Sequence, residues 1–289
     1  MDSLVIFFIV ASIILFFFGA AVYSFLNVVI FRVPRGEEFV KTRSHCPGCG
    51  KVLTPLELIP VVSYLCLGGK CKKCGSKIGI RDVSIEIFGG LSAIASFLFA
   101  IYGRAFVYSM VDSWLGRNAM TDLGLMEISY GRLILCIALR ALAYFSIIGA
   151  LTVICFINID TGKVPTGTLI AFVVVGVFGV IAMPQMEWLT RLLGLAGGAG
   201  IFLFLGLMAK DRELLAGAVI AGTAGAVLGW HELLATAIVA VLIGALVAIC
   251  LLLTGNKKLQ DRFKPIPILC VSLVIGLFLA TQISGLLMV

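Results

Sequence analysis

The chain has 289 residues, of which 61% are hydrophobic and only 13% are charged, and its mean hydropathy is +1.15. This composition excludes an ordinary soluble globular protein and indicates a polytopic membrane protein. In a membrane protein, the formal net charge of +7 depends first on which side of the membrane each loop lies, so the orientation of the spans has to be established before the charge is assigned to a partner.

Apolar runs long enough to cross a bilayer as helices recur along the chain. We expect an all-α membrane protein with about eight transmembrane helices. The first is too long for a signal peptide and is treated as a retained span. The expected spans are 4–31, 84–103, 132–156, 167–184, 190–209, 213–230, 232–254 and 267–288.

The distribution of Lys and Arg orients these spans. The polar loop after the first span carries ten basic residues, and alternation of the spans places seven more on the same side. Four remain on the opposite side, at Arg104, Arg117, Arg132 and Arg191. This is a positive-inside pattern, with the N-terminus outside and the loop in the cytoplasm. The net charge then indicates attraction to anionic membrane lipid and not to nucleic acid.

The polar loop contains two Cys-x-x-Cys pairs, Cys46–Cys49 and Cys71–Cys74, separated by 21 residues. Two such pairs can surround one tetrahedral ion with four thiolates, which predicts a zinc-ribbon-like loop with structural Zn²⁺. The alternatives are two disulfides or four unliganded thiols, and a reducing cytoplasmic location disfavours the disulfides. The predicted organisation is a first helix at 1–31, this four-Cys zinc-binding loop at 32–83, and a helical domain at 84–289.

Polar residues lie at several predicted span ends. Asn27 needs a partner near the inner surface, and Glu86, just inside the second span, is either functional or paired with a residue such as Arg81. Alternation of the spans places the ends of the third and fifth on the cytoplasmic face. These ends carry Asn158 and Asp160 in one segment and Asp211 in the other.

Glycine and alanine recur within the apolar runs. The stripe Gly217, Ala221, Gly225 and Gly229 repeats every four residues and favours close helix packing. The run 194–200 could suggest a nucleotide-binding loop, but it lies within an apolar span with no preceding strand, so helix packing is the better interpretation.

Several motifs combine into a family resemblance. The first span ends in Ser-Phe-Leu-Asn-Val-Val-Ile-Phe-Arg-Val-Pro at 24–34, and the cysteine loop contains Glu-Leu-Ile-Pro at 57–60 followed by Ser63. With the paired cysteines and the order of spans, these stretches resemble the type IV prepilin peptidases, membrane aspartic proteases of bacterial pilus and type II secretion systems. The resemblance covers nearly the whole chain.

The resemblance implies a multi-pass protein of the bacterial inner membrane that removes short basic leaders from prepilins or pseudopilins at the cytoplasmic face. In many members it also implies methylation of the new N-terminus from S-adenosylmethionine. The helical region 84–289 would be the peptidase domain. The family cuts with two aspartates, of which one takes a proton from water and the other, protonated, polarises the scissile carbonyl.

Transferring the aspartate motifs onto this chain exposes two departures. The second aspartate, in a Gly-x-Gly-Asp-x-Lys motif, falls on Asp211, with Ala209 and Lys210 before it and Glu213 in place of the lysine. The first, seven residues before a proline, falls on Asn158, and an amide cannot act as a general base.

Three explanations follow: an engineered Asp-to-Asn change, a natural relative with lost or weakened proteolysis, or substitution by Asp160. Asp160 is about 200° around an ideal helix from Asn158, so the helix end would have to unwind to direct it at Asp211. The alternative functions are a non-cleaving scaffold that binds pilin-like helices and, less favoured, a small-molecule transporter.

Overall fold

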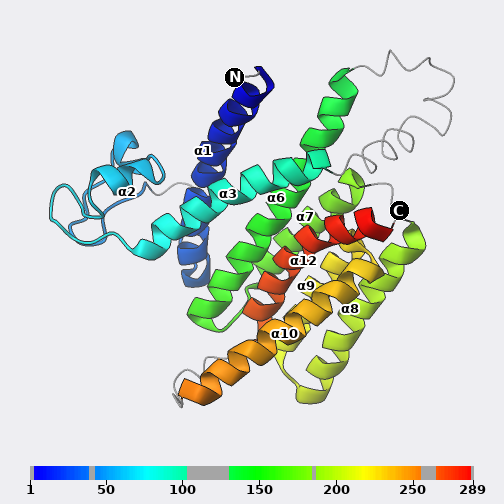
Figure 1. The fold of residues 1–289 in the computed structure, drawn as a ribbon. Coiled ribbons are helices and arrows are strands. Elements are labelled where there is room, and N and C mark those ends of the chain that lie inside the picture. The colour runs from blue at the N-terminus through cyan, green and yellow to red at the C-terminus, as the bar shows by residue number, and fades with distance from the viewer. Residues whose placement is uncertain (1–2, 39–42, 103–129, 184–186, 255–264, 288–289) are drawn as a thin grey trace. The chain divides into compact units, whose positions relative to one another are not determined.

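The computed structural model describes residues 3–38, 43–102, 130–183, 187–254 and 265–287, and all its regular elements there are helical (Figure 1). The long helices are α1 (Ser3–Arg32), α3 (Ile80–Tyr102), α6 (Tyr130–Thr161), α7 (Thr166–Ala182), α8 (Trp188–Ala209), α9 (Arg212–Leu228), α10 (Trp230–Thr254) and α12 (Pro265–Leu287). Three short elements lie between α1 and α3: η1 (Val33–Arg35), η2 (Pro55–Leu58) and α2 (Val62–Cys66).

Each of the eight apolar runs predicted to be a span coincides with one long helix, so the all-helical prediction is confirmed. By length and composition, five of the described helices are able to cross a membrane: α1, α3, α6, α8 and α10. The apolar helical stretches Thr166–Ala182 in α7 and Pro265–Phe278 in α12 are shorter, and α9, with 17 residues, is in neither group. The connections at 103–129 and 255–264, including the basic residues expected there, lie outside the described residues.

The chain divides into two compact units, Met1–Ser96 and Phe97–Val289. In the first unit, α1 and α3 run antiparallel and approach closely at glycines. A Cβ added to Gly89 would lie 2.3 Å from the Tyr23 ring, and one added to Gly19 would lie 2.3 Å from the Gly89 carbonyl oxygen. Nearer the loop, the Asn27 amide donates to the Asp82 carboxylate at 2.8 Å, which is the partner that Asn27 was expected to need.

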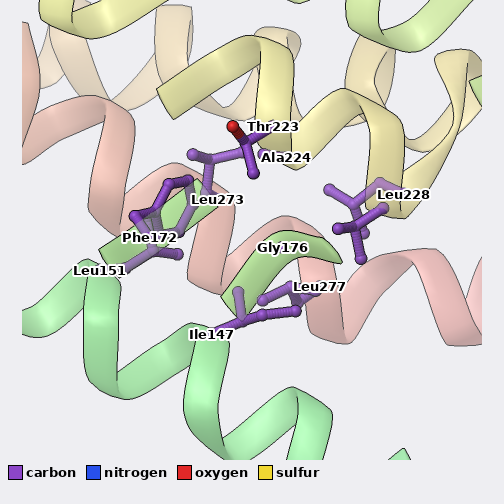
Figure 2. Close-up of a pocket in the computed structure, with 10 residues that line it drawn as sticks. Ile147, Leu151, Phe172, Gly176, Thr223, Ala224, Leu228, Leu273 and Leu277 are labelled. Atoms are coloured by element: carbon purple, nitrogen blue, oxygen red, sulfur yellow. The ribbon is translucent and has the colours of Figure 1, made fainter. Parts of the chain in front are cut away.

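The second unit has an apolar core formed by α6, α7, α9 and α12, with Ile147, Ile148, Phe172, Ile220 and Leu273 among its buried side chains. Between these helices lies an apolar cavity of about 10 Å³, whose lining is shown in Figure 2. Thr223 is the polar residue among those lining it, but no polar surface is exposed to this small space, which therefore stays dry. It is a packing defect of the core and not a ligand site.

Close packing in the second unit depends on small residues. A Cβ added to Gly194 or Gly225 would lie 2.3 or 2.2 Å from the carbonyl oxygen of the other. Gly198 lies against Ala221 and Gly206 against Leu215, so α8 and α9 run antiparallel along their length. The prediction that the glycine-rich run serves helix packing is therefore supported by the contacts of Gly194 and Gly198.

A buried arginine closes the end of this unit at which α7 and α9 terminate. Arg191, 4% exposed, donates to the carbonyl oxygen of Ala226 at 3.1 Å and to that of Met183. The last carbonyl groups of a helix have no partner within the helix. Arg191 supplies donors to the C-terminal ends of two helices at once, which accounts for a charge at this position.

Candidate metal centre and candidate active site

The first cysteine knuckle is a tight backbone turn. The Cys46 N–H donates to the Lys51 carbonyl at 2.8 Å and the Gly50 N–H donates to the Cys46 carbonyl at 2.9 Å. An isolated antiparallel bridge between His45 and Val52 closes it. Gly50 has a φ of 67°, a conformation that glycine adopts without steric cost.

The second knuckle repeats this pattern. The Cys71 N–H donates to the Ser76 carbonyl at 2.8 Å, the Gly75 N–H donates to the Cys71 carbonyl at 2.9 Å, and Gly75 has a φ of 71°. A bridge between Lys70 and Lys77 closes the turn. The two pairs thus form equivalent knuckles, which is the arrangement expected of two halves of one tetrahedral site.

The four sulfur atoms of Cys46, Cys49, Cys71 and Cys74 all lie within 4.8 Å of one another, and those of Cys46 and Cys74 are 3.8 Å apart. A tetrahedral ion with Zn–S bonds of about 2.3 Å requires sulfur separations of about 3.8 Å. The cysteines are free thiols without disulfides in the part of the chain that the structure describes. The donor set therefore fits zinc in both chemistry and spacing.

The local electrostatics distinguish the two thiols of the second knuckle. Hydrogen bonds from the backbone N–H groups of Cys74 and Lys73 lower the pKa of Cys71 to about 6. For Cys74, a hydrogen bond from the Ser76 N–H is outweighed by loss of solvation and by the neighbouring thiols, which raise its pKa to about 11. Four thiolates this close repel one another, and a divalent cation would offset that repulsion.

The segment between the knuckles is held by two carboxylates. Glu57 completes a capping box with Thr54 and pairs with Lys51 at 2.7 Å; hydrogen bonds from Lys51 and Thr54 lower the pKa of Glu57 to about 2. Glu86 of α3 accepts a hydrogen bond from the Val61 N–H at 2.8 Å. Glu86 was expected to be either functional or paired with a residue such as Arg81. The structure gives it a structural partner, which is the backbone amide of Val61.

Val61 itself has an unusual backbone conformation, with φ 62° and ψ −49°. The Val62 N–H donates to the Pro60 carbonyl at 2.6 Å, which makes Pro60–Val61–Val62 a γ-turn of the rare, strained kind. A β-branched residue tolerates this conformation only when its surroundings impose it. The hydrogen bond to Glu86 is one such restraint.

The C-terminal end of α6 carries the residues of the first aspartate motif. Asn158 has an exposed fraction of 0%, whereas Asp160 is exposed. α6 remains helical through Thr161 and ends at Gly162, with φ 70°, whose N–H donates to the Asn158 carbonyl at 2.9 Å. In this structure the helix end is not unwound, so the two side chains point to different environments.

Asp211 is exposed and is the N-cap of α9, where its side chain accepts a hydrogen bond from the Glu213 N–H at 2.9 Å. Lys210 before it ends α8 in the left-handed conformation, with φ 53°. Short polar side chains are the usual N-cap residues. Asp211 therefore has a structural role in addition to the catalytic one that the family resemblance implies.

Helix direction brings the two aspartate segments to one end of the second unit. A Cβ added to Gly176 would lie 2.2 Å from Thr223, and one added to Gly179 would lie 3.3 Å from Val227, so α7 and α9 run parallel. The α6–α7 turn and the α8–α9 turn therefore lie at the same end, as Figure 1 shows at the lower end of this bundle. Asp160 and Asp211 lie in these two turns, at the same end of the unit.

Sequence reasoning missed the γ-turn at Val61 and its hydrogen bond to Glu86. A γ-turn at valine leaves no compositional signal, because valine is rare there. The left-handed Lys210 did have a signal: it occupies the place of a glycine in the Gly-x-Gly-Asp-x-Lys motif, and glycine is the residue that adopts this conformation readily.

Comparison with known protein families indicates the class to which the N-terminal part of the chain belongs. Residues 17–100, which include both cysteine knuckles, match the family model described as the bacterial peptidase A24 N-terminal domain. No solved structure is significantly similar to the chain.

Among curated relatives, the prepilin leader peptidase/N-methyltransferase of Bacillus subtilis is 33% identical over 232 residues, covering 75% of this chain and 92% of the relative. The proteins of the same name from Myxococcus xanthus and Aeromonas salmonicida are 28% and 26% identical, over 85% and 88% of this chain. The chain spans 64% of the length of the Myxococcus protein and 84% of the Aeromonas protein. The chain belongs to the prepilin leader peptidase/N-methyltransferase family.

Proposed function

We propose that this chain is a prepilin-type leader peptidase of the bacterial inner membrane that cleaves short basic leaders from pilin-like or pseudopilin precursors. In this proposal about eight helices span the bilayer, the N-terminus is outside, and the zinc-bearing loop and the aspartates face the cytoplasm. The functional division is into the first helix at 1–31, the metal loop at 32–83 and the peptidase domain at 84–289. Family membership supports the substrate class.

The observation that carries the catalytic assignment is the position of two exposed carboxylates, Asp160 and Asp211, at one end of the second unit. The parallel packing of α7 on α9 accounts for this placement. Asn158, at the family position of the first aspartate, is buried and cannot accept a proton from water. We therefore assign Asp160 as the partner of Asp211, and since α6 is helical through Thr161 here, the pair forms only when the last turn of α6 unwinds.

The proposed chemistry uses the two carboxylates in opposite protonation states. One takes a proton from the attacking water, and the other, protonated, donates a hydrogen bond to the scissile carbonyl. Cys46, Cys49, Cys71 and Cys74 would hold zinc, which with four thiolate ligands has no open position and would serve to fold the loop. The reaction then needs no metal at the scissile bond.

The test is cleavage of a purified prepilin by the reconstituted protein, followed as a shortened product. Asp160→Asn and Asp211→Asn should each reduce the rate at least about 100-fold, the lower range for loss of an acid–base group. Asp211→Asn keeps an N-cap acceptor for α9, so its stability should be nearly unchanged. Full activity of Asp160→Asn would exclude the assigned pair.

A second function, a non-cleaving scaffold that binds pilin-like helices, is favoured by one specific observation: Asn158 occupies the first aspartate position and is fully buried. Under this alternative the unaltered chain binds a prepilin without cutting it. Gain of cleavage by Asn158→Asp, from an inactive parent, would identify the family pair as 158 and 211. Cleavage by the parent would reject the scaffold.

N-terminal methylation is the second activity in the name of these relatives, and S-adenosylmethionine would be the methyl donor. The sequence contains no recognisable methyl-donor motif. The same incubation, repeated with S-adenosylmethionine and analysed by mass spectrometry, tests this activity through a mass increase of one methyl group on the processed product. An unmodified product would confine the function to cleavage.

A further inference from the structure

The segment between the two cysteine knuckles exposes large apolar side chains. Leu56 in η2 is 76% exposed and Leu65 in α2 is 70% exposed, and Ile80, where α3 begins, is 74% exposed. Leu58 and Ile59 add to this apolar surface. Single exposed leucines are common, but several in one short segment of a small polar lobe indicate a surface that is covered in its working state.

The attachment of this segment restricts what can cover it. The loop leaves the end of α1 and returns at the start of α3, and both helices are long and apolar enough to cross a membrane. The hydrogen bond from Val61 to Glu86 holds the segment beside α3 at a residue six positions after Ile80. At 1.5 Å per residue this is about 9 Å along the helix, slightly more than the interfacial layer of about 5–8 Å on each side of a bilayer.

The charge of the second knuckle matches an anionic surface. Its four lysines, Lys70, Lys72, Lys73 and Lys77, are exposed, and no acidic residue occurs between Glu57 and Asp82. Lys70 and Lys77 lie directly opposite one another in an antiparallel bridge. Like charges in that position destabilise the pairing, and anionic headgroups would offset this cost.

We propose that the segment Pro55–Cys66 is an interfacial membrane anchor. Leu56 and Leu65 enter the headgroup and upper acyl layer of the cytoplasmic leaflet, and the lysines of the second knuckle contact its anionic phosphates. Apolar side chains combined with adjacent basic residues are the pattern of such interfacial segments. The anchor fixes the metal lobe, residues 43–79 with the two cysteine knuckles, against the leaflet that also holds the protein's own helices. It requires neither peptidase nor methyltransferase activity.

The depth of the segment can be measured with a tryptophan probe. Leu65→Trp is introduced into the full chain, which is reconstituted in bilayers containing phosphatidylglycerol, and the fluorescence of the parent is subtracted. Lipids brominated near the headgroup end of their acyl chains should quench the probe more than lipids brominated near the end of the acyl chains at the bilayer centre. Leu91→Trp, at a 56% exposed site in the middle of α3, is the matched control and should show the reverse order.

Two results would overturn the anchor. Quenching by aqueous acrylamide without quenching by brominated lipid would mean that the segment is open to water. Protection from both quenchers would mean that protein covers it, either the rest of this chain or a bound precursor. Leu56→Trp repeats the measurement should Leu65→Trp fail to fold.

The contribution of the lysines of the second knuckle to membrane binding is tested by a separate comparison of variants. In the Leu65→Trp background, Lys70→Gln with Lys77→Gln should lower the docked-to-undocked ratio about fivefold per lysine in anionic bilayers, from about 1 kcal/mol per lysine near such a surface. Lys163→Gln with Lys210→Gln removes the same charge from exposed positions of the second unit and should leave the quenching unchanged. Shallow quenching that is equal in anionic and zwitterionic bilayers would exclude an anionic partner.

Discussion

At the scale of single residues, the two non-glycine residues with positive φ in the described part of the chain are Val61 and Lys210. Each lies in or next to a proposed functional position. Val61 is in the proposed anchor, and Lys210 directly precedes Asp211. Both conformations are unfavourable for residues with a side chain. The Val61 N–H donates to Glu86 and the Lys210 N–H donates to the Gly206 carbonyl, and these hydrogen bonds help to maintain them.

Replacing Lys210 by glycine should stabilise the protein by about 1 kcal/mol, because glycine adopts the left-handed conformation without the clash that other residues suffer. The measurement is thermal unfolding in detergent. Ala209→Gly is the matched control: Ala209 is the last residue of α8, and glycine there should not stabilise, since it only weakens the helix. Equal effects of the two changes would contradict a strained Lys210.

Replacing Arg191 by methionine should destabilise the second unit by about 3 kcal/mol, because the carbonyl groups of Ala226 and Met183 would lose buried donors. Chemical or thermal unfolding measures the loss. The exposed Arg212 is the control, since Arg212→Met should change stability by less than about 0.5 kcal/mol. A similar small effect at Arg191 would show that its hydrogen bonds do not hold the ends of α7 and α9.

The sequence could predict candidate residues for the chemistry, but not their surroundings. The cysteine spacing predicted four thiols around one point, because the two knuckles are local turns with local signals. The sequence indicated only that Asn158 and Asp160 lie on different sides of a helix, and not which of them is buried. Which of the two faces the core depends on the packing of α6 with the other helices, which is not encoded locally.

At the scale of helices, small residues determine how α8 and α9 pack. Gly194, Gly198, Gly225 and Ala221 allow the two backbones to approach until a Cβ would overlap a carbonyl oxygen. The four-residue repeat in the sequence predicted this kind of contact. It could not predict the partner of each helix, because these helices are apolar on nearly every side and their hydrophobicity does not select one neighbour.

Gly225→Ala should therefore destabilise the protein by about 3 kcal/mol, since the added methyl group meets the backbone of α8 and the helices must separate. Gly197→Ala is the matched control in the same region, because a Cβ there would meet nothing within 4 Å. That change should stabilise by about 1 kcal/mol through helix propensity. Unfolding of both variants in detergent gives the comparison, and a loss at Gly197 equal to that at Gly225 would contradict the packing argument.

At the scale of the whole molecule, the chain comprises two compact units, and the proposed zinc lies in the first of them. Metal removal should thus have a local effect. Treatment with a strong zinc chelator should make residues 43–79 sensitive to a protease, while the helices α6 to α12 remain protected.

Limited proteolysis with mass spectrometry locates the cuts, and added Zn²⁺ should restore protection. Cys46→Ser should reproduce the sensitivity without a chelator and reduce bound zinc, because a thiolate ligand is lost. Cys66→Ser, at an exposed cysteine outside the cluster, should do neither. Cuts spread evenly over both units after chelation would contradict a metal centre that stabilises only the loop.

The contact between α1 and α3 has a mechanical consequence for this loop. The two helices touch at Gly19 and Gly89 and again through Asn27 and Asp82. Two separated points of attachment resist a change in tilt between two rods, so the paired helices act as a rigid frame. In the proposed topology, the angle at which the cysteine loop meets the bilayer then depends on these two contacts between the helices as well as on the surface of the loop.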